Sequence, residues 1–447
     1  MGEDARDALA PHPSRYTIAV EGDAGETLLF NTACGAFAAL DATCAQAYEN
    51  GTCDAQLEQR LARAGFLTDA TPDEELEALR ARFERQRHDH AELALSLVPT
   101  YACNYRCPYC YEQDVRERGG HMDARVMDAV LAFVERRYSA HAFERLSVQW
   151  YGGDPSLALD VVEELSERMI GFCDERGIDY DALILSNCER INKYAAKMLA
   201  RVRVSVALLT IDGFADMHRR SRVPADGSDS YADVLAAARL LTRQGIRCSA
   251  VMNVDAVNWH EYPELRAFLH DEYGIELEFC RMSDCGHFFG TQPFTHPTFD
   301  LLSPAEFAKL QHEQFAAGGA DAATLAALLA APERFCNGQR DDYFIIDCTG
   351  NVYACDGYIG HESHVNFSVF DEPSERQLQR ISHDPFENAG CSACTLLPLC
   401  LGNCNWERET DQMQCHPLKW SLPSYLKTYR ACFEQPTAGF TLLYAGT

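Results

Sequence analysis

The sequence predicts an α/β fold in which parallel strands are covered by helices. Between residues 94 and 282, short runs of β-type residues alternate with longer segments of helical periodicity. Such alternation favours a parallel sheet, because each helix returns the chain to the edge of the sheet where the next strand begins. Cysteine and glycine motifs directly follow two of these strands. This agrees with functional loops at the carboxyl ends of the strands.

The composition limits the class of protein and its partners. With 447 residues, the chain is too long for one ordinary core and predicts two or three domains. No apolar run reaches the roughly 18 to 20 residues that span a bilayer, and the acidic residues 1–14 lack the apolar segment of a secretory signal. The formal net charge of −28 argues against binding to nucleic-acid phosphates. We therefore expect a cytoplasmic protein with no membrane and no nucleic-acid partner.

Residues 15–75 predict a small α+β unit that precedes the main domain. Two β-type runs, residues 15–22 and 26–32, flank a hairpin-like turn. Helical periodicity follows in residues 33–48 and 53–65, and a short strand-like run ends the unit at residues 66–68. A charged helix over about residues 74–91 is expected to link this unit to the main domain.

The elements of the main domain follow from the alternating pattern. The expected strands are residues 94–100, 146–150, 181–187, 205–213, 247–256 and 275–282. The expected helices between them are residues 122–138, 158–177, 191–202 and 230–245. Residues 286–300, rich in aromatic residues and proline, predict a loop near the mouth of an active site. A helix should then begin after Ser303 as the N-cap, with Pro304 at its first position.

Twenty cysteines in a large cytoplasmic chain indicate metal binding rather than disulfides. The segment CNYRCPYCYE, residues 103–112, spaces Cys103, Cys107 and Cys110 as C-x3-C-x2-C. Three thiolates around an iron–sulfur cube leave one iron open to another ligand. A zinc site or three buried thiols is the alternative, but structural zinc takes four ligands and no fourth lies nearby in the sequence.

This segment resembles the signature of radical S-adenosylmethionine (radical SAM) enzymes, including Tyr109 before the third cysteine. The resemblance implies a partial (β/α)6 TIM-like barrel over residues 93–285. It also implies a [4Fe–4S] cluster whose open iron binds SAM, and a 5′-deoxyadenosyl radical formed after one-electron reduction. The electron would come from an external reductant such as flavodoxin or ferredoxin.

Two further motifs resemble the SAM-binding segments of the same family. YGGDP, residues 151–155, is similar to the GGEP motif, with an aspartate in place of the glutamate, and TIDG, residues 210–213, is similar to the strand that binds the carboxylate and ribose of SAM. The resemblance assigns SAM binding to Tyr109, Gly152, Gly153, Asp154, Thr210 and Arg222. A turn at residues 151–155 and a surface arginine at 222 are the plain alternatives.

A second group of cysteines occupies residues 336–415. Cys336, Gly350 and Cys355 fit C-x13-G-x4-C, and the next four cysteines fit C-x2-C-x5-C-x3-C. The full pattern resembles the SPASM extension of radical SAM enzymes, which carries two auxiliary [4Fe–4S] clusters and brings the expected total to three. By this resemblance the first auxiliary cluster takes Cys336, Cys355 and Cys404. The second takes Cys391, Cys394, Cys400 and Cys415.

Two ligand positions stay open at this point. The first auxiliary cluster lacks an obvious fourth cysteine, and either has an open iron or takes Cys280, Cys285 or Cys348. Cys432 is the alternative to Cys415 in the second. VYACDGY, residues 352–358, resembles the segment of anaerobic sulfatase-maturing enzymes in which an aspartate acts as the base. Asp356 is therefore the candidate catalytic base, and an acid in a turn is the alternative.

The order of elements in residues 1–92 resembles the small winged peptide-recognition domain of peptide maturases. The expected domains are thus residues 1–92, 93–285, a bridging region 286–335, and 336–447. The leading hypothesis is a radical SAM enzyme that abstracts hydrogen from a ribosomally made precursor peptide and forms a thioether or another cross-link. The alternatives are sulfatase-maturase-like oxidation of Cys or Ser to formylglycine, and a non-catalytic iron–sulfur electron carrier.

Overall fold

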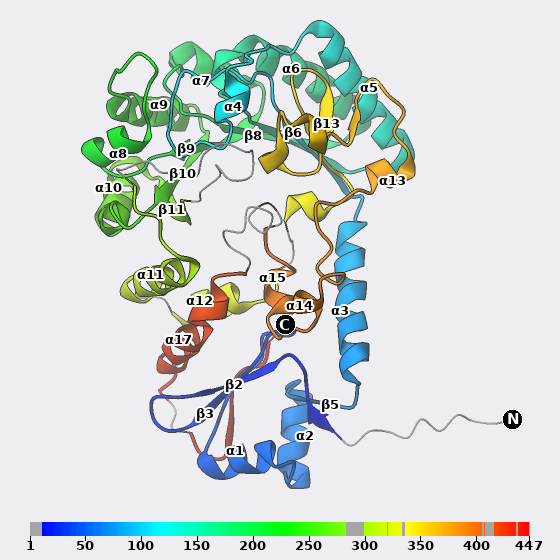
Figure 1. Cartoon of the computed structure of the whole chain (residues 1–447), viewed down its shortest axis with the longest axis vertical. Helices are drawn as coiled ribbons and strands as arrows, with labels where there is room; N and C mark the ends of the chain where they lie inside the picture. The colour runs from blue at the N-terminus through cyan, green and yellow to red at the C-terminus, as the bar shows by residue number, and fades with distance from the viewer. Residues whose placement is uncertain are drawn as a thin grey trace, which may run out of the picture.

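The protein is built as a large α/β domain, a cysteine-rich middle part and a small sheet at the opposite end (Figure 1). The computed structural model describes residues 11–282, 299–319, 321–332, 336–404, 406, 415–434 and 437–446. Residues 286–298 of the loop expected at the active-site mouth, and Cys285, lie outside these ranges. No helix in the described ranges combines the length and apolar character needed to cross a membrane.

The main sheet contains the parallel strands that the sequence predicts. Its order is β11-β10-β9-β8-β7-β6-β12-β13-β14, and the first six strands all run parallel. Their bounds are β6 (Glu92–Leu97), β7 (Arg145–Trp150), β8 (Asp179–Leu185), β9 (Val204–Thr210), β10 (Arg247–Val254) and β11 (Glu276–Arg281). Six parallel strands in sequence order, each joined by helices, confirm the predicted α/β class and its partial barrel.

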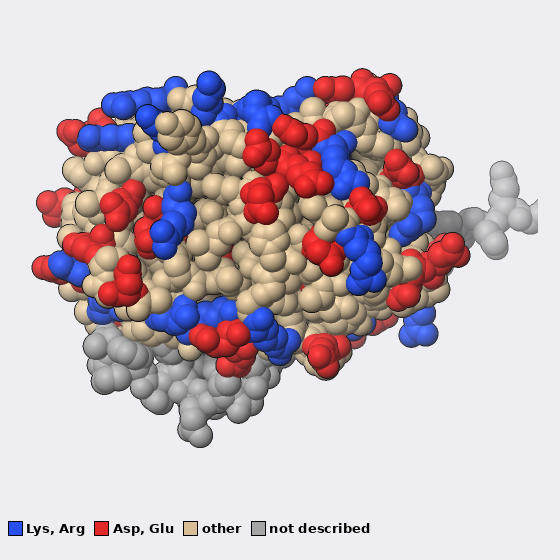
Figure 2. Space-filling model, turned by 90° about the horizontal axis from the view of Figure 1, so that it is seen from above, with Lys and Arg blue, Asp and Glu red and all other residues tan. Residues whose placement is uncertain are grey.

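Helices cover the outer face of this sheet (Figure 1). They are α4 (Gln113–Arg116), α5 (Ala124–His141), α6 (Leu159–Arg176), α7 (Lys193–Arg201), α8 (Ala215–Ser221), α9 (Tyr231–Arg243) and α10 (Tyr262–Tyr273), with short 3₁₀ turns at Pro155–Leu157 and Trp259–Glu261. Asp123 and Asn192 cap the first turns of α5 and α7. Gly177 ends α6 in the left-handed region at φ 70°, where glycine has no Cβ to clash. Seen from above, basic and acidic side chains lie interspersed over this end of the molecule (Figure 2).

The cysteine-rich part continues the main sheet. β12 (Tyr343–Ile346) pairs in parallel with β6, and β13 (Asn351–Tyr353) and β14 (Phe367–Ser368) extend the sheet in antiparallel fashion. Short helical segments follow at Asn337–Gln339, Asp356–Tyr358, Glu362–His364, α13 (Glu375–Leu378), α14 (Ala389–Ser392) and α15 (Leu397–Cys400). Backbone hydrogen bonds between β12 and β6 therefore join the segment that carries Cys355 directly to the strand that leads into the first cysteine motif.

The N-terminal unit differs from the prediction in one of its elements. Residues 37–40 were expected in a helix but form strand β4 (Phe37–Leu40), and only α1 (Ala42–Glu49) is helical. β4 is fully buried because it lies between β3 (Thr27–Asn31) and β15 (Phe440–Tyr444), near the carboxyl terminus of the chain. β2 (Thr17–Glu21) completes this four-stranded sheet, while β5 (Leu67–Thr68) pairs with β1 (His12–Pro13).

The remaining helices hold the small sheet and the middle part together. α2 (Ala55–Arg63) packs in the N-terminal unit, and α3 (Pro72–Arg87) runs alongside the middle part as the expected linking helix (Figure 1). α11 (Pro304–Ala317) begins at Ser303 with a capping box, as predicted, and is followed by α12 (Ala322–Leu329). The sequence did not indicate α17 (Leu418–Ala431), where Tyr429 stacks on Phe37 with ring centroids 4.6 Å apart.

Buried ion pairs fix the end of α3 and the following residues to the start of β12. The Arg87 Nε atom lies 2.9 Å from the Asp341 Oδ1 atom. The Arg137 Nη2 atom, from α5, lies 2.5 Å from the Asp342 Oδ1 atom, and His90 contacts the other Asp342 oxygen. Arg137 and Asp342 are both buried, so each charge depends on the other for its compensation.

Replacing Asp342 with Asn should therefore destabilise the protein by about 3 kcal/mol, because it leaves the buried Arg137 guanidinium without a counter-charge. Thermal unfolding of the metal-loaded protein measures the change. Asp179→Asn is the matched control, since Asp179 pairs with Arg145 on the surface and should contribute about 0.5 kcal/mol or less. Equal effects of the two substitutions would contradict this account of the interface.

Candidate active site

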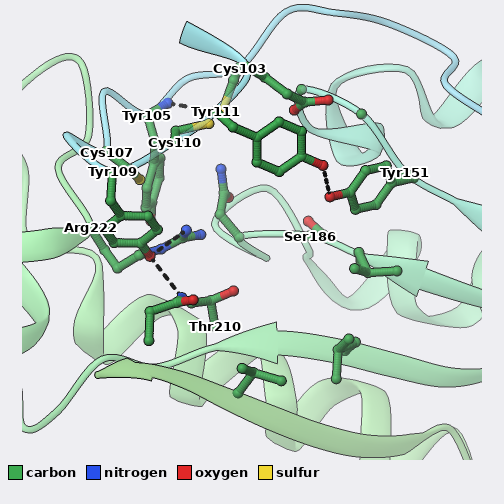
Figure 3. A pocket seen from close by; sticks show the side chains of 18 of the residues that line it. Cys103, Tyr105, Cys107, Tyr109, Cys110, Tyr111, Tyr151, Ser186, Thr210 and Arg222 are labelled. Atoms are coloured by element: carbon green, nitrogen blue, oxygen red, sulfur yellow. Dashed lines mark hydrogen bonds between the residues drawn. The ribbon is translucent and has the colours of Figure 1, made fainter. Parts of the chain in front are cut away.

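A cavity of about 390 Å³ opens at the carboxyl ends of the main-sheet strands (Figure 3). The loop after β6 supplies the three cysteines of the first motif, and β9 and β10 supply Thr210 and Asn253. The lining residues also include Tyr105, Tyr109, Tyr111, Glu112, Arg116, Tyr151, Gly152, Gly153, Ser186, Asn187, Arg222, Arg281, Met282 and Trp406. Of the nine residues predicted to bind the first cluster and SAM, all but Asp154 line this cavity, and the candidate base Asp356 does not line it.

The three cysteines of the first motif lie together on one side of the cavity (Figure 3). Burial raises the pKa of the Cys103 thiol to about 11 and also raises the pKa of Cys107 and of Cys110. Thiols in such surroundings stay protonated until a metal binds them and takes the place of the proton. The donor set therefore fits a metal cluster better than a set of free nucleophiles.

A hydrogen-bonded network joins the other predicted SAM residues. The Tyr109 hydroxyl donates to the Asp212 Oδ2 atom at 2.6 Å. It accepts from the Arg222 Nη1 atom at 3.3 Å and from the Asn253 Nδ2 atom at 3.2 Å (Figure 3). Burial raises the pKa of the Asp212 carboxyl, while the charge of Arg222 opposes that rise. The buried Nε atom of Arg222 has no partner within the described chain and is left to bind a ligand.

The YGGDP segment contacts the cysteine loop more closely than the sequence indicated. A Cβ atom on Gly153 would lie 2.2 Å from the Tyr101 carbonyl oxygen, and one on Gly152 would lie 2.4 Å from Val98. The glycines are thus required by packing of one loop against another, and they line the cavity as well. Asp154 lies behind them, where its Oδ1 atom accepts from the Ser156 amide.

The two oxygens of the Asp154 carboxylate have different surroundings. Its Oδ1 atom also accepts from the Ser186 hydroxyl at 2.8 Å, whereas its buried Oδ2 atom has no partner within the described residues. Ser186 itself lines the cavity. The aspartate is shorter than the family's glutamate, so in this structure Ser186 stands between the carboxylate and the cavity.

Aromatic side chains form another wall of the cavity. The hydroxyls of Tyr111 and Tyr151 contact each other (Figure 3), and the Tyr111 ring centroid lies 5.7 Å from that of Trp406. Glu112 belongs to the same wall and is buried. Burial, to which the charge of Asp356 adds, raises the pKa of the Glu112 carboxyl to about 8. This wall can receive the part of a substrate that approaches the cysteine loop.

A second pocket of about 240 Å³ brings together four cysteines of the C-terminal part. It is lined by Cys391, Cys394, Cys400 and Cys415, together with Lys419, whose Nζ atom donates to the Cys415 sulfur at 3.2 Å. Cys432, the alternative ligand, does not line this pocket. It is exposed on the C-terminal end of α17, where its sulfur donates to the Thr428 carbonyl.

Cys336, Cys355 and Cys404 form the third group. The thiols of Cys404 and Cys336 add to the burial that raises the pKa of Cys355, which indicates that they lie near it. Cys348 lies elsewhere, buried beside Tyr101 and against Gly120 in the main core. It contributes to the pKa shift of neither Cys336 nor Cys355.

Cys280 lies on β11 and is exposed. Within the described ranges, no three His, Cys, Asp or Glu side chains converge closely enough to hold a single metal ion. The three cysteines of the first motif and the four C-terminal cysteines each line a pocket instead.

Asp356 follows Cys355 and faces the main sheet. Its carboxylate accepts from the Tyr343 hydroxyl, with distances of 2.9 and 3.1 Å to its two oxygens. Burial raises the pKa of Asp356, although the Tyr343 hydrogen bond lowers it. Asp356 does not line the cavity, but its charge adds to the burial that raises the pKa values of Glu112, Tyr111 and Tyr151 in the aromatic wall.

Several lining residues were missed from the sequence. Ser186, Asn187, Asn253 and Arg281 carry no motif, but each lies at or just after the carboxyl end of a strand. That position is the signal that could have selected them. Trp406 had no such signal, because it comes from the C-terminal part, more than 120 residues after Met282, the preceding cavity residue in the sequence.

Comparisons with known proteins agree with this geometry. Residues 97–269 match the family model described as the Radical SAM superfamily. The cysteine-type anaerobic sulfatase-maturating enzyme of Clostridium perfringens is 22% identical over 374 residues, covering 77% of this chain and 97% of that enzyme. The radical SAM cyclopropyl synthase TigE of Paramaledivibacter caminithermalis is 22% identical over 179 residues, covering 37% of this chain and 36% of that enzyme.

Two solved structures share the fold. Native anSMEcpe with bound AdoMet and Cp18Cys peptide superposes with a TM-score of 0.55 at 16% identity, covering 76% of this chain and 99% of that chain. Streptococcus suis SuiB bound to precursor peptide SuiA gives a TM-score of 0.51 at 15% identity, covering 91% of this chain and 99% of that chain.

The sheet, the cysteine loop and the cavity at its edge define an enzyme that uses an iron–sulfur cluster and SAM. With the superfamily match over residues 97–269, the chain contains a radical SAM domain and is similar to anaerobic sulfatase-maturating enzymes. This confirms the radical SAM domain predicted from the cysteine motif.

Replacing Gly153 with Ala should displace the YGGDP segment from the cysteine loop, because the added Cβ atom overlaps the carbonyl oxygens of Tyr101 and Ala102. We expect a loss of stability of about 1–3 kcal/mol and reduced iron loading at the first motif. Iron analysis and thermal unfolding measure both effects. Gly171→Ala in α6 is the matched control, since nothing lies within 4 Å of its added Cβ atom. Full iron loading of Gly153→Ala would contradict the packing role.

Proposed function

We propose that this protein is a peptide-modifying radical SAM enzyme that acts on a ribosomally made precursor peptide. The observation that carries the proposal is the single cavity in which the three cysteines of the first motif meet an aromatic wall from two distant parts of the chain. The similarity to anSMEcpe, which was solved with a bound peptide, supports a peptide as the substrate class.

In this proposal Cys103, Cys107 and Cys110 hold the SAM-binding [4Fe–4S] cluster. Reduced by one electron, cluster and SAM together supply a 5′-deoxyadenosyl radical. The SAM-binding side chains and glycines are those predicted from the motifs: Tyr109, Gly152, Gly153, Asp154, Thr210 and Arg222. Arg222 suits the SAM carboxylate because its buried guanidinium retains an unpartnered Nε atom within the described structure.

Two auxiliary [4Fe–4S] clusters complete the proposed cofactor set. Cys391, Cys394, Cys400 and Cys415 would hold one of them, with Lys419 placed to offset the negative charge of its thiolates. Cys336, Cys355 and Cys404 would hold the other and leave one iron without a cysteine from the described chain. Cys348 is a poor candidate for that position, because it is buried in the main core.

The proposed reaction removes two hydrogens from the peptide. One leaves as a hydrogen atom to the deoxyadenosyl group, and the other leaves as a proton and an electron when a thioether or another cross-link closes. Asp356 is the candidate acceptor of the proton at its carboxylate, where Tyr343 donates a hydrogen bond that orients it. The electron would pass to an auxiliary cluster.

A second candidate is oxidation of a Cys or Ser side chain to formylglycine. The similarity to cysteine-type anaerobic sulfatase-maturating enzymes over 77% of this chain favours it, as does the VYACDGY segment that carries Asp356. Such an oxidation also removes two hydrogens from the substrate residue. A Ser side chain then becomes the aldehyde directly, whereas a Cys side chain becomes a thioaldehyde that water hydrolyses to the aldehyde and hydrogen sulfide. Product analysis therefore distinguishes the two reactions.

The proposed partners are the precursor peptide and an external one-electron reductant such as flavodoxin or ferredoxin. In this proposal, residues 1–92 form a domain that recognises the peptide, and residues 93–285 form the domain in which the radical reaction takes place. Residues 286–335 bridge to the auxiliary-cluster domain, residues 336–447. The pairing of β15 with β4 supports a fixed position of the recognition unit, because the end of the auxiliary-cluster domain forms part of its sheet.

The reconstituted, reduced enzyme should release 5′-deoxyadenosine from SAM, and Cys107→Ala should abolish that release because two thiolates do not retain the cluster. With the precursor peptide encoded beside the gene, the product should be lighter by two hydrogens. Chromatography and mass spectrometry measure both results. Cys53→Ala, in the N-terminal unit, is the control and should keep full activity. Release of 5′-deoxyadenosine by Cys107→Ala would refute the proposal, and an aldehyde product would favour the second candidate.

Cys415→Ser should lower the iron content by about four atoms per chain, because it removes one of the four cysteines that line the second pocket and would hold a cluster there. Cys432→Ser should leave the iron content unchanged, since that sulfur lies on the exposed end of α17. Iron and sulfide analysis with electron paramagnetic resonance of the reduced protein separates the two variants. The reverse order of effects would assign the ligand to Cys432.

A further inference from the structure

The aromatic wall of the cavity contains a carboxylate that the SAM chemistry does not use. Glu112 follows Cys110 by two residues and is 7% exposed. Its Oε1 atom is fully buried and has no hydrogen-bond partner in the described structure. Burying a carboxylate oxygen without a hydrogen-bond partner costs free energy. Its presence at the surface of a cavity therefore points to a ligand that supplies the missing hydrogen bond.

The rings around Glu112 are held in place by contacts of their own. The hydroxyls of Tyr111 and Tyr151 contact each other, and neither is a hydrogen-bond partner of the buried Glu112 Oε1 atom. Trp406 lies directly over Gly357, where a Cβ atom would be 2.2 Å from the indole Cδ1 atom. The buried Nε1 atom of Trp406 has no partner in the described chain either. The aromatic wall thus presents aromatic faces, one carboxylate and one N–H group to a ligand bound in the cavity.

No positively charged side chain of the described chain forms an ion pair with Glu112. No Arg, Lys or His of that chain lies within 4.0 Å of its carboxylate, whereas Arg116, one turn further on, lies 3.5 Å from Glu117. The group that acts on Glu112 most strongly through its charge is Asp356, another carboxyl. Glu112 thus has an acidic neighbour and no described basic group within 4.0 Å.

We infer that Tyr111, Glu112, Tyr151 and Trp406 form a subsite for a positively charged side chain, Lys or Arg, of the peptide substrate. A carboxylate beside aromatic faces recognises an ammonium or guanidinium group, which gains both the ion pair and the attraction of the rings. A neutral side chain of the same length would leave the Glu112 oxygen without a partner. This inference rests on the proposed function only in taking a peptide as the substrate.

The test uses the full-length, cluster-loaded enzyme saturated with SAM and left unreduced, so that binding is measured without turnover. The probes are acetyl-Ala-Ala-Lys-Ala-Ala-amide, its Arg analogue and its norleucine analogue, followed by calorimetry or equilibrium dialysis. The Lys or Arg probe should bind at least about tenfold more tightly than the norleucine probe. Glu112→Gln should abolish that preference, because it removes the charge and keeps the shape.

Asp114→Asn is the matched control, because it removes an acidic charge from the exposed side of the same short helix. It should leave the preference intact, and iron analysis of both variants shows whether the first cluster is retained. Equal binding of all three probes to the wild type would overturn the inference. The absence of binding by every probe at 10 mM, a Kd that corresponds to a binding free energy of about 2.7 kcal/mol, would overturn it as well. So would a preference that survives Glu112→Gln. Release of 5′-deoxyadenosine, measured separately, decides the proposed function.

Discussion

Three cysteine thiols whose pKa values are raised by burial, and which a metal would have to deprotonate, are the constraint on which the rest of this structure depends. Cys103, Cys107 and Cys110 lie in a loop with little regular structure of its own, so neighbouring segments must hold it. The glycines at 152 and 153 do so by direct contact with its backbone. The parallel sheet beneath brings further strand ends to the same place, because every parallel strand delivers its carboxyl end to one edge.

Two walls of unlike chemistry meet at this edge. One wall is polar, where the Tyr109 hydroxyl is hydrogen-bonded to Asp212 and to Arg222. The other is aromatic and contains a carboxylate oxygen without a partner in the described chain. Radical chemistry requires that a small cofactor and a larger substrate approach each other closely while water is kept away. In the proposed function, the polar wall would face the cofactor and the aromatic wall would face the substrate.

The parts of the molecule are joined by strand pairing rather than by loose linkers. β12 adds the cysteine-rich part to the edge of the main sheet at β6, and β15 adds the end of the chain to the N-terminal sheet at β4. Buried ion pairs of Asp341 and Asp342 fix α3 and α5 at the same junction. The auxiliary-site cysteines therefore keep a defined position relative to the cavity, which electron transfer over a fixed distance requires.

Local chemistry in the sequence determined the α/β alternation, the cysteine groups and the capped start of α11 at Ser303, because periodicity, ligand spacing and capping act over a few residues. The sequence could not place Phe37–Leu40, which has helical periodicity but lies between two strands, one of them some 400 residues away. Nor could it show that the Ser186 hydroxyl donates a hydrogen bond to Asp154, or that Trp406 packs near the Tyr111 ring next to Glu112. Such contacts depend on which distant segments the packed core brings together, and only the tertiary structure decides that.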